Sequence, residues 1–276
     1  MTQYFLYIIE ASICLFLFYI IYLLFIKNDT FHKVKRLYLL ASVVISIVIP
    51  ILPSIKWTKE IEKIIIPKSI ENASGAISND NFGKFMFNIT SDQVSINYKE
   101  GPSITLSTLL CIFYFLCIAY MCFRLSVNLY RIINLVKRNK GRPYRKHNII
   151  LLTDNYPTFS FFSYIFLNDR DLNQKDKKDI LLHEETHLKQ GHSLDIIFLE
   201  ICKIAFWFNP IIWQYKNSLL KVHECLADEF VVASRPESIQ DYQSLLLKQY
   251  LSNINIELIH PFNYSLIKFR INMMTK

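Results

Sequence analysis

The sequence is poor in glycine, with 5 among 276 residues, and it has no paired cysteine motif. Its six cysteines are scattered along the chain, and no two of them form a C-x-x-C pair. This spacing argues against a disulfide framework and against a cysteine-based zinc site. We interpret the cysteines as small buried apolar residues.

The amino terminus lacks the basic residues and the small-residue cleavage site that mark a secretory signal peptide. Three residues precede an apolar run over residues 4–26, which is broken only by Glu10 and Ser12. At about 1.5 Å per residue, a helix of this length crosses the hydrocarbon core of a bilayer. We therefore expect the run to remain in the protein as a first membrane helix.

Two further apolar runs follow, over residues 37–55 and 104–123. Hydrophobic residues make up 52% of the chain, and the mean hydropathy is positive at +0.22. The sequence therefore predicts an integral membrane protein whose first partner is the lipid bilayer. Residues 1–123 would form a three-span membrane region with an outer loop over residues 56–103.

The basic residues predict the orientation of the spans. Residues 27–36 carry four basic side chains against one acid, and residues 124–148 carry eight basic side chains and no acid. The predicted outer loop is balanced, with six lysines and six acids over residues 56–103. The positive-inside rule then places the N-terminus outside and a basic linker, residues 124–148, in the cytoplasm of a multi-pass inner-membrane protein. We favour this topology and contact with anionic lipid over direct nucleic-acid binding.

From residue 149 onward, the pattern becomes that of a mixed domain. Two β-rich runs, residues 149–153 and 158–167, are separated by a turn signal and precede helical periodicity. Two interpretations stay open for the second run: an edge strand that binds an extended peptide, or a strand of the core.

Within the predicted domain, His183, Glu184 and His187 form an H-E-x-x-H motif. Residues four apart lie on one face of a helix, so both imidazoles reach a single metal ion. Glu184 is rotated by about 100° from His183 and can take a proton from an attacking water. The motif therefore predicts a zinc site that hydrolyses a carbonyl compound.

A zinc hydrolase site needs a third protein ligand, and the following residues can deliver one. Gly191 can end the motif helix, Ser193 can cap a new helix over residues 194–208, and Pro210 can start a returning helix. Two legs of about 15 residues each, roughly 22 Å, would bring Glu224 back to the level of His187. Asp228, one turn further on, would hold a histidine N–H from behind.

This hairpin resolves an ambiguity at residues 194–213, which are apolar enough for a fourth span. A crossing segment would place Glu224 on the opposite side of the bilayer from His183. We therefore expect a membrane-associated hairpin, and the sequence leaves open whether it enters the bilayer or packs at its surface.

Other polar residues near the motif have simpler explanations. His223 is a rival to its neighbour Glu224 as third ligand, and the acid at i+4 favours Glu224. His192 is expected off the ligand face at a helix end, Glu185 and Glu229 in solvent, and Asp195 as a helix cap. No spacing identifies the residue that stabilises the oxyanion.

The motifs "HEETH", "HSLD", "FWFNPIIW" and "HECLADE" together resemble the BlaR/MecR-type family of membrane-embedded regulatory zinc peptidases, in the form common in Bacteroidetes. The segments "TFSFFSYIFLN" and "FNYSLIKFRINMM" fit the same pattern. The resemblance implies a gluzincin-like α+β peptidase domain over residues 149–276, after three N-terminal membrane helices in a mainly α-helical protein. It further implies that His183, His187 and Glu224 bind Zn²⁺, that Glu184 is the general base, and that Asp228 supports a ligand.

The same resemblance implies a zinc-dependent endopeptidase that acts on the cytoplasmic side. Its substrate would be a transcriptional repressor or the chain itself, in response to a signal. The best-known members sense β-lactams through an extracellular C-terminal penicillin-binding domain, which this sequence lacks, so we expect no β-lactam sensing here. Two alternatives remain: a housekeeping membrane protease of the CAAX type, and a non-catalytic sensor or scaffold with a structural zinc.

Overall fold

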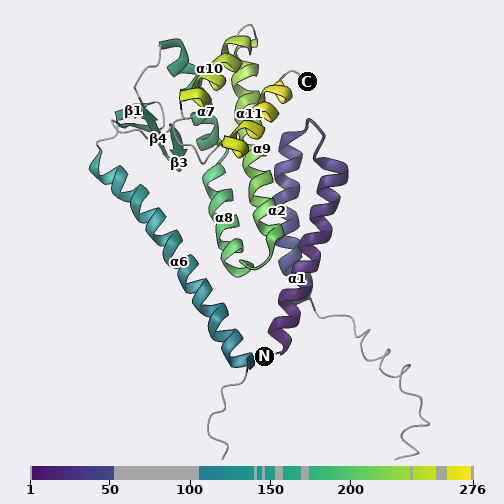
Figure 1. Ribbon diagram of the computed structural model, residues 1–276. Coiled ribbons are helices and arrows are strands. Elements are labelled where there is room, and N and C mark those ends of the chain that lie inside the picture. Colours follow the sequence, from purple (N-terminus) through teal and green to yellow (C-terminus); the bar gives the residue numbers. More distant parts are fainter. Residues whose placement is uncertain are drawn as a thin grey trace, which may run out of the picture. The chain divides into compact units, whose positions relative to one another are not determined.

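The computed structural model describes residues 2–52, 106–139, 142–144, 147–152, 158–168, 174–236, 239–252 and 260–274. Within these residues the chain is mainly helical, with one four-stranded sheet (Figure 1). The predicted outer loop, residues 56–103, lies outside the described residues. The chain divides into two compact units, residues 1–49 with 115–276 and residues 50–114. Every contact discussed below lies within the first unit.

Three helical segments precede the sheet. Their bounds are α1 (Thr2–Ile21), which continues into a π-helical turn (Tyr22–Ile26), α2 (His32–Val48), which ends in a 3-10 turn (Ile49–Ile51), and α6 (Leu106–Arg138). By length and composition, three stretches are able to cross a membrane: Leu6–Ile26, His32–Ile51 and Thr108–Arg138. The number and order of these stretches agree with the three predicted spans.

Two helix boundaries differ from the predicted ones. α2 begins at His32 rather than at residue 37, because the basic residues before the apolar run continue its helix. α6 continues to Arg138, so residues 124–138 of the predicted basic linker are helical. No glycine or proline occurs between Leu106, where α6 begins, and Gly141, which explains why the helix continues beyond its apolar stretch.

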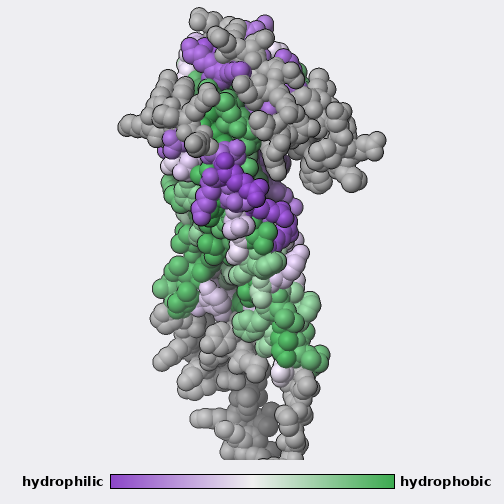
Figure 2. Space-filling view, turned by 90° about the vertical axis from the view of Figure 1, so that its left-hand side faces the viewer, coloured by the Kyte–Doolittle hydropathy of each residue, from purple (hydrophilic) through white to green (hydrophobic). Residues whose placement is uncertain are grey.

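Apolar side chains cover the outer faces of the candidate spans. α1 exposes Leu6, Ile9, Ile13, Phe16 and Leu17, and α6 exposes Leu109, Leu110, Ile112, Phe113, Phe115, Leu116, Tyr120 and Phe123. Figure 2 shows hydrophobic residues gathered along one stretch of the surface, with hydrophilic residues gathered beside them. A water-soluble surface rarely carries apolar patches of this length, whereas lipid would cover them.

The short sheet has the strand order β1-β2-β4-β3. Its strands are β1 (Arg142–Tyr144), β2 (His147–Leu152), β3 (Phe159–Phe161) and β4 (Tyr164–Asn168). β2 and β4 run parallel, and the other two pairs are antiparallel. The second predicted β-rich run is thus two strands joined by a turn, and β3 lies at one end of the sheet among the described strands.

Three consecutive helices carry the sequence motifs: α7 (Gln174–Lys189), α8 (His192–Ala205) and α9 (Pro210–Ser234). Gly191 separates the first two in the left-handed conformation, with φ of 67°, which glycine adopts without steric cost. Gly191, not Ser193, occupies the N-cap position of α8. The Ser193 hydroxyl instead accepts a hydrogen bond from the Phe162 N–H at 3.1 Å, which fixes the β3–β4 turn.

Helices α8 and α9 lie side by side and contact each other, and α9 also contacts α1 and α2 (Figure 1). Their shared core contains apolar residues from all four helices: Leu15 of α1, Leu39 and Val43 of α2, Leu199 of α8 and Leu219 of α9, among others. Buried hydroxyls link the same helices. Ser42 donates to the Tyr215 hydroxyl at 3.1 Å, and the Tyr19 and Ser218 hydroxyls lie 3.0 Å apart.

Two further helices complete the described fold, α10 (Ile239–Ser252) and α11 (His260–Met274). α11 contacts both α9 and α10. Tyr242 and Leu245 of α10 pack with Ile180 of α7 and Val231 of α9 in a second core. These helices therefore close around α7, the helix that carries the H-E-x-x-H motif.

The turn into α9 is fixed by a cap whose removal should be measurable. The buried Asn209 side chain accepts a hydrogen bond from the Ile211 N–H at 2.9 Å, and Pro210 occupies the first helical position. We predict that Asn209→Ala lowers the free energy of unfolding by about 1 kcal/mol, because it leaves a helix N–H without its partner. Asn209→Asp, which keeps the acceptor, is the control. Chemical denaturation in detergent, followed by tryptophan fluorescence, measures both, and equal stability of the two variants would contradict the assignment.

Candidate metal centre

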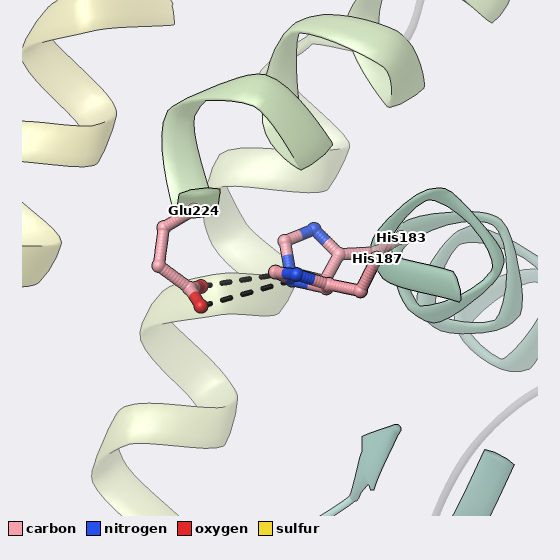
Figure 3. A group of neighbouring side chains, drawn as sticks. All are labelled: His183, His187 and Glu224. Atoms are coloured by element: carbon pink, nitrogen blue, oxygen red, sulfur yellow. Dashed lines mark hydrogen bonds and ion pairs between the residues drawn. The ribbon is translucent and has the colours of Figure 1, made fainter. Parts of the chain in front are cut away.

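Three of the predicted site residues converge at one point. His183 and His187 project from α7, and Glu224 projects from α9 toward both rings (Figure 3). The two Nε2 atoms lie 3.2 Å apart, and Glu224 carboxylate oxygens lie 3.5 Å from His183 Nε2 and 3.7 Å from His187 Nε2. One nitrogen or oxygen of each side chain lies within 4.8 Å of the others, and this is the one such group among the described residues.

The donor set fits a divalent metal of the zinc type. Ligands about 2.0–2.1 Å from a tetrahedral Zn²⁺ lie about 3.3 Å from one another, which is close to the three distances above. Two imidazoles and a carboxylate are also the ligands of several zinc hydrolases. Three protein ligands leave one coordination position free, and the Glu224 side chain is 26% exposed, so water can reach the group.

Hydrogen bonds behind His183 direct its free nitrogen toward this point. Its Nδ1 lies 2.9 Å from the Tyr242 hydroxyl and 3.2 Å from Asp228 Oδ1. The Tyr242 hydroxyl itself donates to Asp228, so it accepts from His183. These partners assign one ring proton to Nδ1, so Nε2, which faces His187 and Glu224, is the nitrogen that can bind a metal once its own proton has left.

His187 is oriented in the same way by a different partner. Its Nδ1 lies 2.6 Å from Nδ1 of His192, whose Nε2 lies 3.1 Å from the Gln190 side-chain oxygen. Because that oxygen only accepts, His192 carries its proton on Nε2 and accepts from His187 through Nδ1. The Nε2 lone pair of His187 is thereby left for the metal.

A buried arginine neutralises the two acids of α9. Arg270 of α11 donates to both Asp228 oxygens, from Nε at 2.8 Å and from a terminal nitrogen at 2.6 Å, and it lies 2.8 Å from Glu224. Although burial raises the pKa of Glu224, the Arg270 cation holds that pKa below its ordinary value. The pKa of Asp228 is lowered as well, since its contacts with Arg270 and His183 outweigh burial. Both acids are therefore ionised at neutral pH.

Glu184 lies on the same helix with different surroundings. It is buried, and this burial raises the pKa of its carboxyl, even though the neighbouring His183 and the Ser160 hydroxyl of β3 act in the opposite direction. A raised pKa brings a carboxylate closer to the range in which it both accepts and returns a proton near neutral pH. The side chain is thus suited to proton transfer next to the metal group.

The neighbouring polar residues depart from the sequence interpretation. His192 begins α8 and is outside the ligand group, as expected, but it is 2% exposed and contacts His187. Asp195 binds Arg36 and His223 instead of capping α8. Glu185 is buried rather than solvated, and its charge is balanced by Lys189 at 3.0 Å. Glu229 is exposed, as expected.

Sequence reasoning missed the two residues behind the ligands, Tyr242 and Arg270. Both come from helices after the motifs, and neither shows a periodic or spaced signal toward His183 or Glu224. The sequence offers one indication of Arg270: it lies in the segment "FNYSLIKFRINMM", which resembles the pattern of the BlaR/MecR-type family. The rival ligand His223 points elsewhere, with its Nε2 2.9 Å from Asp195.

Comparison with known proteins agrees with this architecture. Residues 160–274 match the sequence profile of the family described as BlaR1 peptidase M56. The methicillin resistance mecR1 proteins of Staphylococcus aureus and Staphylococcus epidermidis are 27% identical to the chain over 299 aligned residues, which cover 94% of this chain and 48% of each relative.

Residues 160–274 therefore match an M56-type peptidase domain, and the chain is similar to proteins of the BlaR/MecR-type family. The matched residues 160–274 include the three residues of the metal group, the partners Asp228, Tyr242 and Arg270, and all of α8. The alignment with the mecR1 proteins covers 94% of this chain, and the chain has three candidate membrane helices, so it is a membrane protein with an M56 peptidase domain. It spans about half the length of the curated relatives it matches.

Metal binding should release a proton, because His183 is charged in the metal-free protein. Burial lowers the pKa of His183, but the Asp228 and Glu224 carboxylates outweigh it and raise this pKa to about 9. The pKa of His187 is lowered to about 3, chiefly by burial, so this ring is already neutral. We predict that Zn²⁺ binding at pH 7 releases about one proton and that the affinity rises with pH until about pH 9.

Calorimetry in buffers of different ionisation enthalpy measures the released protons. Asp228→Asn is the matched variant, because it keeps the shape of the side chain but removes the carboxylate that raises the pKa of His183. It should release clearly less than one proton. Equal release by both proteins would contradict the assigned cause.

The Tyr242 hydroxyl should contribute to metal affinity without contacting the metal. We predict that Tyr242→Phe weakens Zn²⁺ binding about 10-fold, since outer-shell partners of histidine ligands typically contribute factors of 10 to 100. Competition with a fluorescent zinc chelator measures the affinity. An unchanged affinity would show that Asp228 alone orients His183.

Proposed function

We propose that the chain is a membrane-embedded zinc endopeptidase. The observation that carries this proposal is the convergence of His183, His187 and Glu224 beside the buried carboxyl of Glu184. The histidine pair and its neighbouring acid are the donor and base arrangement that zinc-dependent amide hydrolysis uses.

When bound, zinc would polarise the scissile carbonyl and lower the pKa of a water molecule at the site. Glu184 would accept the proton of the attacking water on its carboxylate and return it to the leaving amine. Its raised pKa suits both transfers. Arg270 would keep Glu224 ionised, and Asp228 with Tyr242 would keep the proton of His183 on Nδ1.

The position of β3 supports an extended peptide as substrate. Among the described strands β3 is at the end of the sheet, and its Ser160 hydroxyl contacts Glu184. A peptide that pairs with the outer edge of β3, at the end of the described sheet, would pass alongside the catalytic carboxylate. This arrangement favours the edge-strand interpretation of residues 158–167 over the core-strand one.

Contacts with α1 support a hairpin that enters the bilayer. The Tyr215 hydroxyl of α9 lies 3.5 Å from the Leu15 carbonyl, and Leu15 is near the middle of the stretch Leu6–Ile26. If that stretch crosses the membrane, then Tyr215 lies near the depth of its apolar centre, and the turn between α8 and α9, about 9 Å earlier along the helix, is also within the bilayer. The site itself lies in the second half of α9, and the nearby α8 residue Asp195 binds Arg36 in the basic first turns of α2. By the positive-inside rule this end faces the cytoplasm.

The role we propose is signal-linked cleavage of a cytoplasmic regulator or of the chain itself. It rests on similarity to a family whose relatives here are named for methicillin resistance. Signal-linked cleavage favours a transcriptional repressor as the substrate. A housekeeping protease of the CAAX type would use the same site on other membrane proteins, and only its substrates would differ.

A purely structural zinc is disfavoured by the geometry. Structural sites bind zinc through four protein ligands, whereas three donors converge here among the described residues. The partly exposed Glu224 and the buried Glu184 next to the group also have no function in a closed structural site.

Glu184→Gln separates metal binding from chemistry. We predict that this variant binds Zn²⁺ like the wild type and loses about 10²- to 10⁴-fold in cleavage rate, because the amide cannot accept a proton. Mass spectrometry of self-cleavage products and a quenched-fluorescent peptide mixture measure the rate, and metal analysis measures zinc. Glu229→Gln, an exposed acid on α9, is the control. Cleavage that survives in Glu184→Gln would exclude the proposed base, and absence of zinc from the wild type would exclude the site.

A further inference from the structure

A run of polar contacts leads from a candidate membrane helix to the metal group. On α2, Arg36 uses Nε to donate to Asp195 at 2.7 Å and a terminal nitrogen to donate to the Gln190 carbonyl at 2.7 Å. Asp195 is in the first turn of α8, and Gln190 directly follows α7. One guanidinium therefore spans the corner between the two helices, although it lies more than 150 residues away in the sequence.

From this corner the contacts continue to a metal-ligand histidine. Asp195 lies 2.9 Å from His223 Nε2, and the ring of His223 stacks on that of His192 with centroids 3.9 Å apart and planes 6° apart. His192 in turn lies 2.6 Å from Nδ1 of His187. His192 and His223 are 2% and 1% exposed, so water cannot replace these contacts.

The positions of the ring protons show how these contacts affect the metal ligand His187. The Gln190 side-chain oxygen accepts from His192 Nε2, which makes His192 Nδ1 an acceptor for His187 and leaves His187 Nε2 free for the metal. Arg36 holds the backbone of that same glutamine. Without Arg36 the corner loses the contacts that fix both Gln190 and the Asp195–His223 pair, and the His192 ring loses its fixed orientation.

We propose that Arg36 is a positioning residue that fixes the tautomer and orientation of His187; this inference rests on the proposed metal site. Its effect is transmitted through Asp195, Gln190, His223 and His192. The guanidinium is required because its two separate donors reach two acceptors, one directly after α7 and one on α8. Because Arg36 lies in the stretch His32–Ile51, the site then depends on the position of a candidate membrane helix relative to α7 and α8. A displacement of α2 would change metal affinity and geometry before it changed any ligand contact directly.

The test compares Arg36→Gln, Arg36→Lys and the control Lys33→Gln in the full chain in detergent. Lys33 is an exposed basic residue one turn earlier on the same helix. We expect Arg36→Gln to weaken Zn²⁺ binding about 10-fold and to alter the visible d–d spectrum of the Co²⁺-loaded protein. Arg36→Lys should be intermediate or equally impaired, because one ammonium cannot reproduce the two-point contact, and Lys33→Gln should match the wild type.

Gln190→Leu serves as a second variant in case Arg36→Gln fails to fold. It keeps the backbone carbonyl that Arg36 binds but removes the acceptor of His192, so we expect the same change in Zn²⁺ affinity and Co²⁺ spectrum. Arg36 and Asp195 should also be coupled: the double variant Arg36→Gln/Asp195→Asn should weaken Zn²⁺ binding by less than the product of the single effects.

A different result is expected if Arg36 only holds the helices together and has no influence on His187. In that case Arg36→Gln lowers the unfolding temperature of the metal-free protein while Zn²⁺ affinity and the Co²⁺ spectrum stay as in the wild type, which would overturn the proposal alone. If the wild type binds neither metal, the metal site and this proposal both fail.

Discussion

The ion pairs of Arg270 with Asp228 and Glu224 are the interaction on which the site depends. Removing these charges from water costs several kcal/mol per ion, and only well-placed opposite charges offset that cost. Arg270 meets the requirement with two hydrogen bonds to Asp228 and a contact to Glu224 at 2.8 Å. The proposed metal ligand on α9 is therefore held ionised by a helix near the C-terminus, and α11 has to dock before the site is complete.

The same pattern extends around the two histidines. His183 is oriented by Asp228 and Tyr242, and His187 by His192. Each Nδ1 is occupied by a partner, so each Nε2 is the nitrogen directed at the metal position, and both face Glu224. Helices α9, α10 and α11 support one ligand and the α7–α8 corner supports the other. A group built from two sides in this way is fixed before any metal arrives, which reduces the reorganisation that binding requires.

Local spacing was sufficient to predict the ligand group but not its support. The four-residue spacing of His183 and His187 and the matched lengths of two helices predicted that Glu224 would approach them, and the structure places the three together. Tyr242 contacts His183 and Arg270 contacts Glu224 from helices later in the sequence, and Arg36 reaches only Asp195 and Gln190, so no periodic pattern connects these residues to the group.

The errors of the sequence interpretation have the same origin. Glu185 was expected in solvent because a single helix has a polar face. α7, however, is packed against the sheet, α8, α9 and α10, so little of its surface reaches water. His192 and Asp195 were given local roles at a helix end, whereas their partners come from other helices. Burial by neighbouring elements, which no short motif encodes, decided the role of each.

X-ray absorption at the zinc edge tests the central claim most directly, because it reports the atoms around the metal in the intact chain. We expect one zinc per chain with two imidazole nitrogens, one carboxylate oxygen and one further light atom from solvent, all at about 2.0–2.2 Å. A sulfur ligand at about 2.3 Å, or a closed shell of four protein ligands, would contradict the account.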